Sequence, residues 1–240
     1  MYKNTYTCTR EIDYYDTDRF GNMKISAIMR HCAVAGDEHC VEHGFNHKFF
    51  IKHDASFVLS RINIDILKYP EYNDTVIVKT WQSDISGPFY QRIVLFYDTS
   101  DNLLLEYVSS WLLVTISTRR IIKPATFKHN LPVHIEEKFQ LKKTDKLKAQ
   151  EGYRKVYSRY IGESSIDTNG HLNNAVYADI ACDALDEQPS GKKIKSFKLN
   201  FIKECFCRET MDVHTVKLNG KYYIKGEISN SISFLSEIEF

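Results

Sequence analysis

The sequence lacks a run of about 18 consecutive apolar residues, which a membrane-spanning helix requires. Its first residues, MYKNTYTCTREIDYY, are polar and strand-like and contain no apolar core of a secretory signal peptide. Six cysteines, at positions 8, 32, 40, 182, 205 and 207, are scattered without the spacing of a disulfide framework. These absences favour a reduced, cytoplasmic protein that does not cross a membrane.

The chain also lacks an excess of either charge, because 32 Lys and Arg residues stand against 31 Asp and Glu residues, for a net charge of +1. A field this weak does not indicate nucleic-acid binding, and any acidic partner must meet a local basic patch. Two basic clusters are present, Arg119, Arg120 and Lys123, and Lys142, Lys143, Lys146, Lys148, Arg154 and Lys155. Such runs are commonly solvated surface, and a docking site for an acidic partner is the alternative.

Apolar patterning is abundant: 43% of the residues are hydrophobic and 13% aromatic, which suffices for two domains in 240 residues. Apolar residues recur at helical spacing in ISAIMRHCAVAGDEHCVEH, 25–43. A strand-like segment precedes this helix and four β-rich runs follow it, separated by turn signals. The predicted strands are 5–15, 56–69, 75–85, 89–98 and 103–118.

After a charged, Lys-rich connector the same order of elements returns. A strand is predicted at 153–163 and a helix at about 173–186. Four more strands follow near 193–204, 209–218, 221–228 and 231–240. The order strand, helix, four strands is therefore written twice.

The repeat is also visible in the residues. INIDILKYPEYNDTVIV at 62–78 aligns without a gap onto FKLNFIKECFCRETMDV at 197–213. YDTDRFGNM at 15–23 echoes IDTNGHLNN at 166–174 if two residues are inserted before the glycine. Together with the repeated element order, these pairings predict a duplication.

The duplication predicts an α+β fold of two paired halves. Each half has one central helix and a mostly antiparallel sheet of five to six strands, and wrapping the sheet around the helix buries one face of each. The expected division is an N-terminal half at 1–128, a charged linker at 129–152 and a C-terminal half at 153–240.

The stretch DTNGHLNNAVY, at 167–177, gathers hydrogen-bonding side chains directly before the second helix. If it is extended, Asp167, Asn169 and His171 share a face beside the free N–H groups and positive dipole end of that helix. In the alignment with two inserted residues, Asn169 takes the place of Asp18. Capping or turn structure is the alternative, because Asn, Asp and Gly are common before helices.

A second difference between the halves points to the same region. The gapless alignment puts Glu204 and Cys205 where the first half has Tyr69 and Pro70. Proline has no functional side chain and tyrosine is a poor base at neutral pH. Acid–base side chains are therefore concentrated in the second half.

Several of these stretches resemble one family, the plant and bacterial acyl-acyl-carrier-protein thioesterases, and the resemblance covers nearly the whole chain. DTNGHLNNAVY is similar to the family's D-x-N-x-H-x-N-N-x-x-Y loop and helix start, and FIKEC at 201–205 to its acidic residue followed by Cys. SSWLLVTISTRR at 109–120 resembles its Ser-x-Trp strand ending in Thr-Arg-Arg, and KTW at 79–81 has a counterpart.

This resemblance implies a tandem double hotdog fold and a role in fatty acid biosynthesis. The implied reaction is hydrolysis of the thioester between a fatty acyl chain and the 4′-phosphopantetheine arm of acyl carrier protein. No metal and no organic cofactor are implied. The partner is acyl carrier protein, without nucleic acid or membrane, and the enzyme is expected to be a monomer or a homodimer.

The catalytic set that the resemblance implies is Asp167, Asn169, His171 and Glu204. Cys205 matches a cysteine that the family's mechanism has been argued to use. Adjacent strand residues face opposite sides, however, which favours Cys205 as a packed small residue. The favoured mechanism has Glu204, with His171, activating a water while Asn169 and helix N-terminal amides polarise the carbonyl.

The remaining expectations concern binding. The acyl chain is expected to lie in the first half against the helix at 25–43, with Ile28, Met29 and Cys32 as lining residues and plain core packing as the alternative. The expected carrier-docking residues are Arg119, Arg120, Lys142 and Lys143.

Other functional classes stay open. An acyl-coenzyme A thioesterase shares the chemistry without the protein partner, and a non-catalytic acyl-binding module shares the fold. HCVEH at 39–43 matches a zinc-peptidase pattern. Because His39 and His43 continue the apolar stripe of the helix, packed histidines are favoured over a zinc site.

Overall fold

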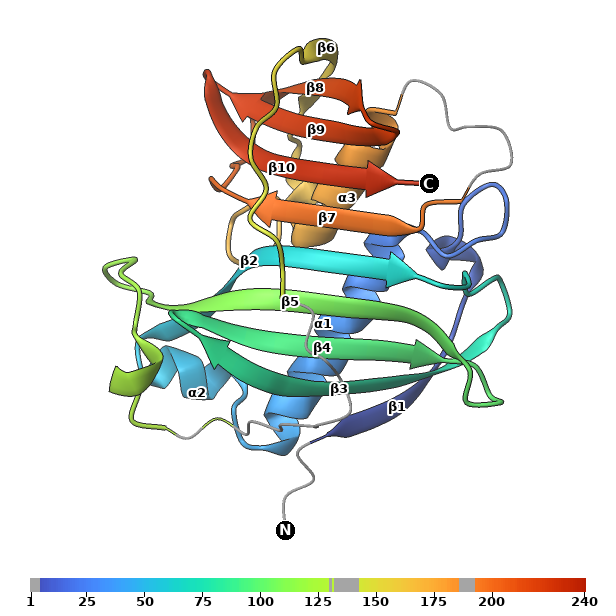
Figure 1. The fold of residues 1–240 in the computed structure, drawn as a ribbon. Coiled ribbons are helices and arrows are strands. Elements are labelled where there is room, and N and C mark those ends of the chain that lie inside the picture. Colours follow the sequence, from blue (N-terminus) through green and yellow to red (C-terminus); the bar gives the residue numbers. More distant parts are fainter. Residues whose placement is uncertain (1–4, 130, 132–142, 186–192) are drawn as a thin grey trace.

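The computed structural model describes residues 5–129, 131, 143–185 and 193–240. Within these residues, ten strands form one continuous antiparallel sheet with the long helices against one face (Figure 1). The strand order is β1-β3-β4-β5-β2-β7-β10-β9-β8-β6. Strands of the first half therefore occupy one side of the sheet and strands of the second half the other, and each half has the same internal order read from its outer edge.

The predicted elements of the first half are confirmed. They are β1 (Tyr6–Glu11), α1 (Ile25–Glu42), β2 (Ala55–Ile66), β3 (Thr75–Ser86), β4 (Phe89–Tyr97) and β5 (Leu103–Thr115), with short 3-10 turns at Tyr14–Asp16 and Pro124–Thr126. The sequence did not predict α2 (His47–Lys52), which is too short to show a helical period. Asn46 caps it by accepting a hydrogen bond from the Phe49 amide at 3.0 Å.

The second half repeats the first with shorter elements. They are β6 (Arg154–Tyr160), a 3-10 turn at Glu163–Ser165, α3 (Asn174–Asp183), β7 (Ser196–Phe201), β8 (Thr210–Leu218), β9 (Lys221–Ile228) and β10 (Ser231–Glu239). The helix and the five strands were predicted, the 3-10 turn was not, and β7 ends before the predicted 204. The amides of Ile202 and Lys203 both donate to the Ser233 carbonyl, at 2.8 and 3.0 Å, which turns the chain out of the ladder.

The two halves meet where β2 pairs with β7. Ile62 lies opposite Leu199, and Ile64 lies opposite Phe197. In the gapless alignment Ile62 is equivalent to Phe197, and Ile64 is equivalent to Leu199. Ile62 therefore pairs with the equivalent of Ile64, and Ile64 pairs with the equivalent of Ile62. The seam is self-complementary, as in a two-fold symmetric dimer interface.

One hydrophobic core runs through both halves on the helix side of the sheet. Ala27, Ile28 and Ala35 of α1 have no exposed surface, and neither have Ile62 and Ile64 of β2 beneath them. Burying an aliphatic side chain of this size stabilises a fold by roughly 1.5–3 kcal/mol. α1 also packs against α3, so the helices tie the halves together as the seam does.

The outer face of the sheet carries residues 143–153, which lead into the second half (Figure 1). The Thr144 and Ser110 hydroxyls lie 2.5 Å apart, the Leu147 amide donates to Asn200 Oδ1 at 2.8 Å, and Asn200 Nδ2 donates to the Asp145 carbonyl at 3.0 Å. Because Ser110 is on β5 and Asn200 on β7, this segment is bonded to both halves.

No helix in the described part of the chain is both long and apolar enough to cross a membrane.

Candidate active site

The loop before α3 is a compact turn, which the sequence allowed as the alternative to an extended segment. The Asp167 amide donates to the His171 carbonyl at 2.8 Å, and Asp167 Oδ1 accepts from the amides of Asn169 (2.8 Å) and His171 (3.3 Å). Gly170 has a φ of 80°, which a residue without Cβ adopts readily. Asn173 caps α3 by accepting from the amide two residues on, at 3.0 Å. The Asp167 carboxylate therefore shapes the loop from within.

The loop before α1 has the same backbone bonds and corrects the alignment. The Asp18 amide donates to the Asn22 carbonyl at 2.8 Å, and Asp18 Oδ1 accepts from the amides of Phe20 (2.8 Å) and Asn22 (3.1 Å). Asp18 is thus the equivalent of Asp167, and the predicted two-residue insertion was wrong. Phe20 and Asn22 take the places that an asparagine and a histidine hold in the second half.

An imidazole, a carboxylate and a guanidinium meet beside the α3 loop. His171 Nε2 lies 3.3 Å from Glu204 Oε2, and Arg119 Nη1 donates to Glu204 Oε1 at 3.0 Å. Arg119 Nη2 is 3.5 Å from His171 Nε2. The imidazole is mostly buried (15% exposed) against the edge of the Phe206 ring, whereas the carboxylate is 41% exposed. A proton can pass between these groups, and a solvent water can reach them.

Arg119 belongs to the first half, although its partners belong to the second. It follows β5 in a turn closed by its own amide, which donates to the Thr115 carbonyl at 2.9 Å, and its φ is 55°. A left-handed backbone at a non-glycine residue costs about 1–3 kcal/mol and must be held by its surroundings. The sequence placed Arg119 in a docking cluster, because nothing in a linear pattern connects residues 119 and 204.

Glu204 and Cys205 are neighbours with opposite environments. Cys205 is fully buried, its Sγ lies 2.8 Å from Ser233 Oγ, and burial raises the pKa of its thiol. Its carbonyl accepts from the Leu172 amide at 2.8 Å, which ties the α3 loop to the end of β7. The Cys205 side chain is a packed element of the core, and Glu204 is the side chain that borders open space.

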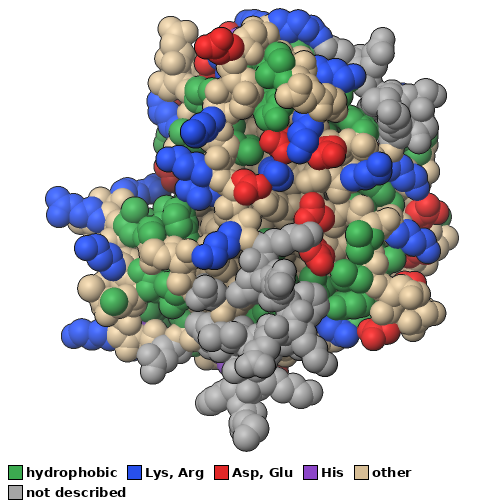
Figure 2. Space-filling model, viewed as in Figure 1, with side chains coloured by type: hydrophobic (Ala, Val, Ile, Leu, Met, Phe, Trp, Pro, Cys, Tyr) green, Lys and Arg blue, Asp and Glu red, His purple; other side chains and the backbone are tan. Residues whose placement is uncertain are grey.

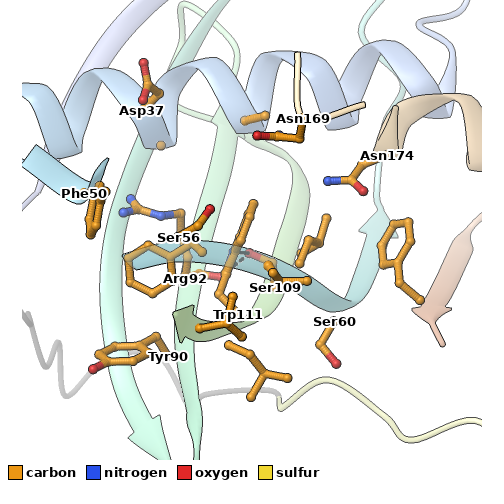
Figure 3. A pocket seen from close by; sticks show the side chains of 18 of the residues that line it. Asp37, Phe50, Ser56, Ser60, Tyr90, Arg92, Ser109, Trp111, Asn169 and Asn174 are labelled. Atoms are coloured by element: carbon orange, nitrogen blue, oxygen red, sulfur yellow. Dashed lines mark hydrogen bonds between the residues drawn. The ribbon is translucent and has the colours of Figure 1, made fainter. Parts of the chain in front are cut away.

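A cavity of about 760 Å³ extends from Glu204 and His171 into the first half, between α1, α2 and the sheet (Figure 3). Phe50, Tyr90 and Trp111 supply aromatic surface on its walls. Residues of the α3 loop and the first turn of α3, Asn169 and Asn174 among them, border its opposite side. The cavity therefore joins the ionisable groups of one half to an interior space of the other.

Of the three residues expected to line an acyl pocket, only Cys32 borders this cavity. Ile28 and Met29 are 0% and 3% exposed and belong to the hydrophobic core, so the prediction was wrong for both. Cys32 is followed on the same face of α1 by Gly36 and Cys40, which also border the cavity. The cavity begins only at Cys32 because the preceding turn of α1 is packed directly against core residues.

The basic clusters lie on different faces of the molecule. Arg119 is in the candidate site and Arg120, its exposed neighbour, lies beside it. Lys143 lies over the outer face of the sheet, where its carbonyl accepts from Asn63 Nδ2 at 3.4 Å. That face mixes basic and acidic side chains (Figure 2). Lys142 is outside the described residues.

The histidines of the zinc-like motif are packed side chains. His39 is fully buried, its Nδ1 accepts from Arg92 Nη1 at 3.1 Å, and its ring centroid lies 4.8 Å from that of His43. Burial, aided by Arg92 and His43, lowers the pKa of His39 to about 3. Across the described ranges, no group of three or more His, Cys, Asp or Glu side chains is arranged to hold a metal ion.

Comparison with known sequences gives a consistent set of matches. Family models described as the acyl-ACP thioesterase N-terminal domain and C-terminal domain match residues 3–126 and 145–239. The palmitoyl-acyl carrier protein thioesterase of Arabidopsis thaliana is 29% identical over 168 residues, 64% of this chain and 39% of the relative. The chain spans less than half the length of the curated relatives it matches.

Solved structures agree on the fold. An acyl-ACP thioesterase from Bacteroides thetaiotaomicron superposes with a TM-score of 0.90 at 18% identity, covering 99% of this chain and 98% of that one. The 12:0-ACP thioesterase from Umbellularia californica superposes with a TM-score of 0.77 at 21% identity, covering 100% and 98%. The chain has the double hotdog fold of these proteins.

Proposed function

Because the chain belongs to the acyl-ACP thioesterase family, we propose that it hydrolyses the thioester between a fatty acyl group and the 4′-phosphopantetheine arm of acyl carrier protein. The products are a free fatty acid and the carrier thiol. One observation carries the proposal: the His171–Glu204 pair, 3.3 Å apart, stands where the cavity opens. A hydrolase for a long apolar acyl group needs this combination of an acid–base pair and a deep binding space.

In the proposed reaction, Glu204 and His171 act together as the base that activates a water. The water oxygen forms a bond to the thioester carbon while its proton passes to the His171–Glu204 pair. The tetrahedral intermediate then collapses, the C–S bond breaks, and the pantetheine thiolate takes up that proton. General-base catalysis of this kind contributes about 10²- to 10⁴-fold to the rate.

The negative charge on the intermediate's oxygen also needs donors. Asn169 and Asn174, whose side chains carry amide donors, border the cavity next to the pair, and the dipole of α3 is positive at that end. We assign Arg119 to holding Glu204 in place, because its guanidinium already donates to that carboxylate at 3.0 Å. Burial of Cys205 supports water, rather than this thiol, as the nucleophile.

The proposal divides the work between the halves. The half at 153–240 supplies the reacting groups, the half at 1–128 supplies the acyl-binding cavity, and the segment at 129–152 links them. Each methylene transferred from water into such a cavity stabilises the complex by about 0.8 kcal/mol. Six free cysteines support a reducing compartment such as the cytoplasm.

Acyl-coenzyme A is the alternative substrate, because it presents the same thioester on the same pantetheine arm. The protein carrier is favoured by the surface around the opening. Lys203 borders the cavity, and so do the exposed side chains of Ile116 and Ile202. Arg120 is exposed and directly follows Arg119, which also borders the cavity. An acidic carrier protein can meet both the basic and the apolar part of this surface.

The deciding experiment measures kcat and KM for one acyl chain on three carriers: acyl carrier protein, coenzyme A and N-acetylcysteamine. Arg120→Glu and Lys203→Glu should raise KM for the acyl-carrier-protein substrate and leave the N-acetylcysteamine thioester unaffected. Lys143→Glu, on the outer face, is the matched control and should change neither. Equal effects on all three carriers would remove the carrier assignment, and acyl binding without turnover would favour the non-catalytic module.

A further inference from the structure

The inner face of the first-half sheet becomes polar where it borders the cavity. Gln82 of β3 lies directly opposite Arg92 of β4, and Arg92 lies opposite Ser109 of β5. Directly paired residues of adjacent strands point to the same face, so the three side chains form one row. All three border the cavity, and Figure 3 shows Arg92 beneath α1, on the side of the cavity away from Asn174.

Arg92 is a buried cation that has no counter-ion in the part of the chain that the structure describes. It is 9% exposed, and its guanidinium donates to His39 Nδ1 (3.1 Å), Thr80 Oγ1 (3.3 Å) and Cys40 Sγ (3.4 Å). These are neutral acceptors, and no carboxylate of the described residues lies within 4.0 Å of it. Asp37 also borders the cavity, but Figure 3 shows its carboxylate on the other side of the α1 ribbon. An unneutralised charge in a low-dielectric interior is unfavourable by several kcal/mol or more.

Hydrogen-bond donors in the same row are unused. A guanidinium has five N–H donors, and the Nε of Arg92 has no partner among the described residues. Gln82 is 6% exposed, and its Nε2 has no hydrogen-bond partner in the same part of the chain. Two buried side chains that border one cavity therefore both carry donors without a partner among the described residues.

The helix above makes room for the guanidinium. A Cβ at Gly36 would lie 3.2 Å from Arg92 Cδ and 3.3 Å from its Nε. Glycine inside a helix costs about 1 kcal/mol relative to alanine. The glycine that makes room for Arg92 between α1 and the sheet therefore lowers the stability of the helix. An apolar side chain in place of Arg92 would not require this glycine.

We propose that the Gln82–Arg92–Ser109 row is a binding subsite for a carboxylate on the acyl chain, so that the preferred substrates are thioesters of dicarboxylic acids. The proposal rests on the proposed function, which it narrows to a substrate class. A carboxylate neutralises Arg92 and accepts from it and from Gln82, and such charge-assisted bonds are the strong ones. A methyl-ended chain leaves the same donors unpaired, which penalises its binding.

The first test compares N-acetylcysteamine thioesters of equal carbon number whose far end is a methyl, a hydroxyl or a carboxylate. The wild-type enzyme should have its highest kcat/KM with the carboxylate. In Arg92→Met the carboxylate-to-methyl ratio of kcat/KM should fall at least tenfold, and Arg92→Lys should retain part of it. Replacing a buried, unpaired charge with an apolar side chain of similar volume is commonly tolerated by the fold. Gln82→Leu, which keeps Arg92, should lower the same ratio to a smaller extent.

Two outcomes of this test would overturn the inference. One is a wild-type preference for the methyl-ended chain that Arg92→Met leaves unchanged. The other is an Arg92→Met enzyme that gains activity on longer methyl-ended thioesters but loses no activity specifically on carboxylate-ended ones. Arg92 would then only limit the length of the cavity.

Calorimetric titration with free acids separates the inference from the proposed function. The wild-type protein should bind an α,ω-dicarboxylic acid more tightly than the monocarboxylic acid of equal length, and Arg92→Met should abolish the difference. Lys143→Met, on the outer face, should preserve it. If no thioester is hydrolysed but this difference is found, the proposed function fails and the subsite stands. If hydrolysis proceeds and the difference is absent, the subsite fails alone.

Discussion

The loops before α1 and α3 have one backbone and two sets of side chains. In each, an aspartate holds two amides of its own turn, and a glycine with φ near 80° (Gly21, Gly170) completes it. In each, the residue two positions before the helix donates to the segment that follows a strand. Met23 donates to the Pro70 carbonyl after β2, and Leu172 to the Cys205 carbonyl after β7, both at 2.8 Å.

The side chains at three other equivalent positions differ. The second half has an asparagine, a histidine and Glu204 where the first has Phe20, Asn22 and Tyr69. Tyr69 is almost fully buried, and burial raises the pKa of its hydroxyl well above the ordinary value. The comparison teaches that an aspartate and a glycine shape both loops, whereas the three positions that changed carry the groups to which we assign the chemistry.

The largest effect should come from the position where the halves differ most. Glu204→Gln removes the proposed base while keeping its shape, and kcat should fall about 10²- to 10⁴-fold. The melting temperature should barely change, because the carboxylate is 41% exposed. Tyr69→Phe, the matched change in the first half, should leave kcat unchanged. A folded Glu204→Gln enzyme with near-normal turnover would remove Glu204 from the mechanism.

The next effect tests the guanidinium that crosses between the halves. Arg119→Met should lower kcat by about 10- to 100-fold. This loss is smaller than the loss expected on removing a buried hydrogen-bond donor, because the Arg119 side chain is 58% exposed. Arg119→Lys should recover part of the rate, since the charge remains without the forked geometry. Arg120→Met is the neighbouring control. Equal losses in both arginine variants, measured with a small thioester, would indicate a general field effect instead.

The paired aspartates separate folding from chemistry. Asp18→Ala and Asp167→Ala should each lower the free energy of unfolding by about 1–2 kcal/mol, because each leaves two loop amides without their acceptor. Only Asp167→Ala should also lower kcat, by displacing Asn169 and His171. Urea denaturation and steady-state kinetics on both variants check this. A large loss of kcat in Asp18→Ala would show that the loops are coupled.

The smallest effect is expected at the cysteine. Cys205→Ala should keep most of kcat and lower the free energy of unfolding by about 1 kcal/mol through the lost contact with Ser233. Mass spectrometry of the enzyme quenched during turnover should find no acyl group on Cys205. An acyl-enzyme at this residue would overturn the assignment of water as the nucleophile.

Much of the fold followed from the sequence because its signals are local. Alternating and helical apolar periods predicted α1, α3 and the ten strands, and the gapless alignment of 62–78 with 197–213 predicted the duplication. The boundary of β7 did not follow, because it depends on the Ser233 carbonyl, which is supplied by another strand. The sequence left open whether the α3 loop is extended or a turn, because alternation in a sequence does not reveal a turn closed by an aspartate.

The candidate site followed less completely. Asp167, Asn169, His171 and Glu204, the catalytic set that the resemblance implies, all border the cavity. Arg119 was placed in a surface cluster, since its contact with Glu204 joins residues 85 positions apart. Ile28 and Met29 were expected to line the cavity, but the cavity begins one helical turn later. The place where the helix and the sheet separate depends on the packing of the whole protein and cannot be predicted from a local pattern. Nothing in the sequence indicated a role for Arg92, because the strand that carries it, β4, does not alternate regularly between polar and apolar residues.

The seam between β2 and β7 has a consequence for how the chain folds. It joins five residue pairs, against eleven between β2 and β5, and its partners are far apart in the sequence. Loop-closure entropy disfavours such contacts until nearer ones have formed, so the seam is expected to close late. Until then β2 and β7 are unpaired edges with matching hydrogen-bond patterns. At high concentration, β2 of one molecule can pair with β7 of another, which gives a domain-swapped dimer with both active sites complete.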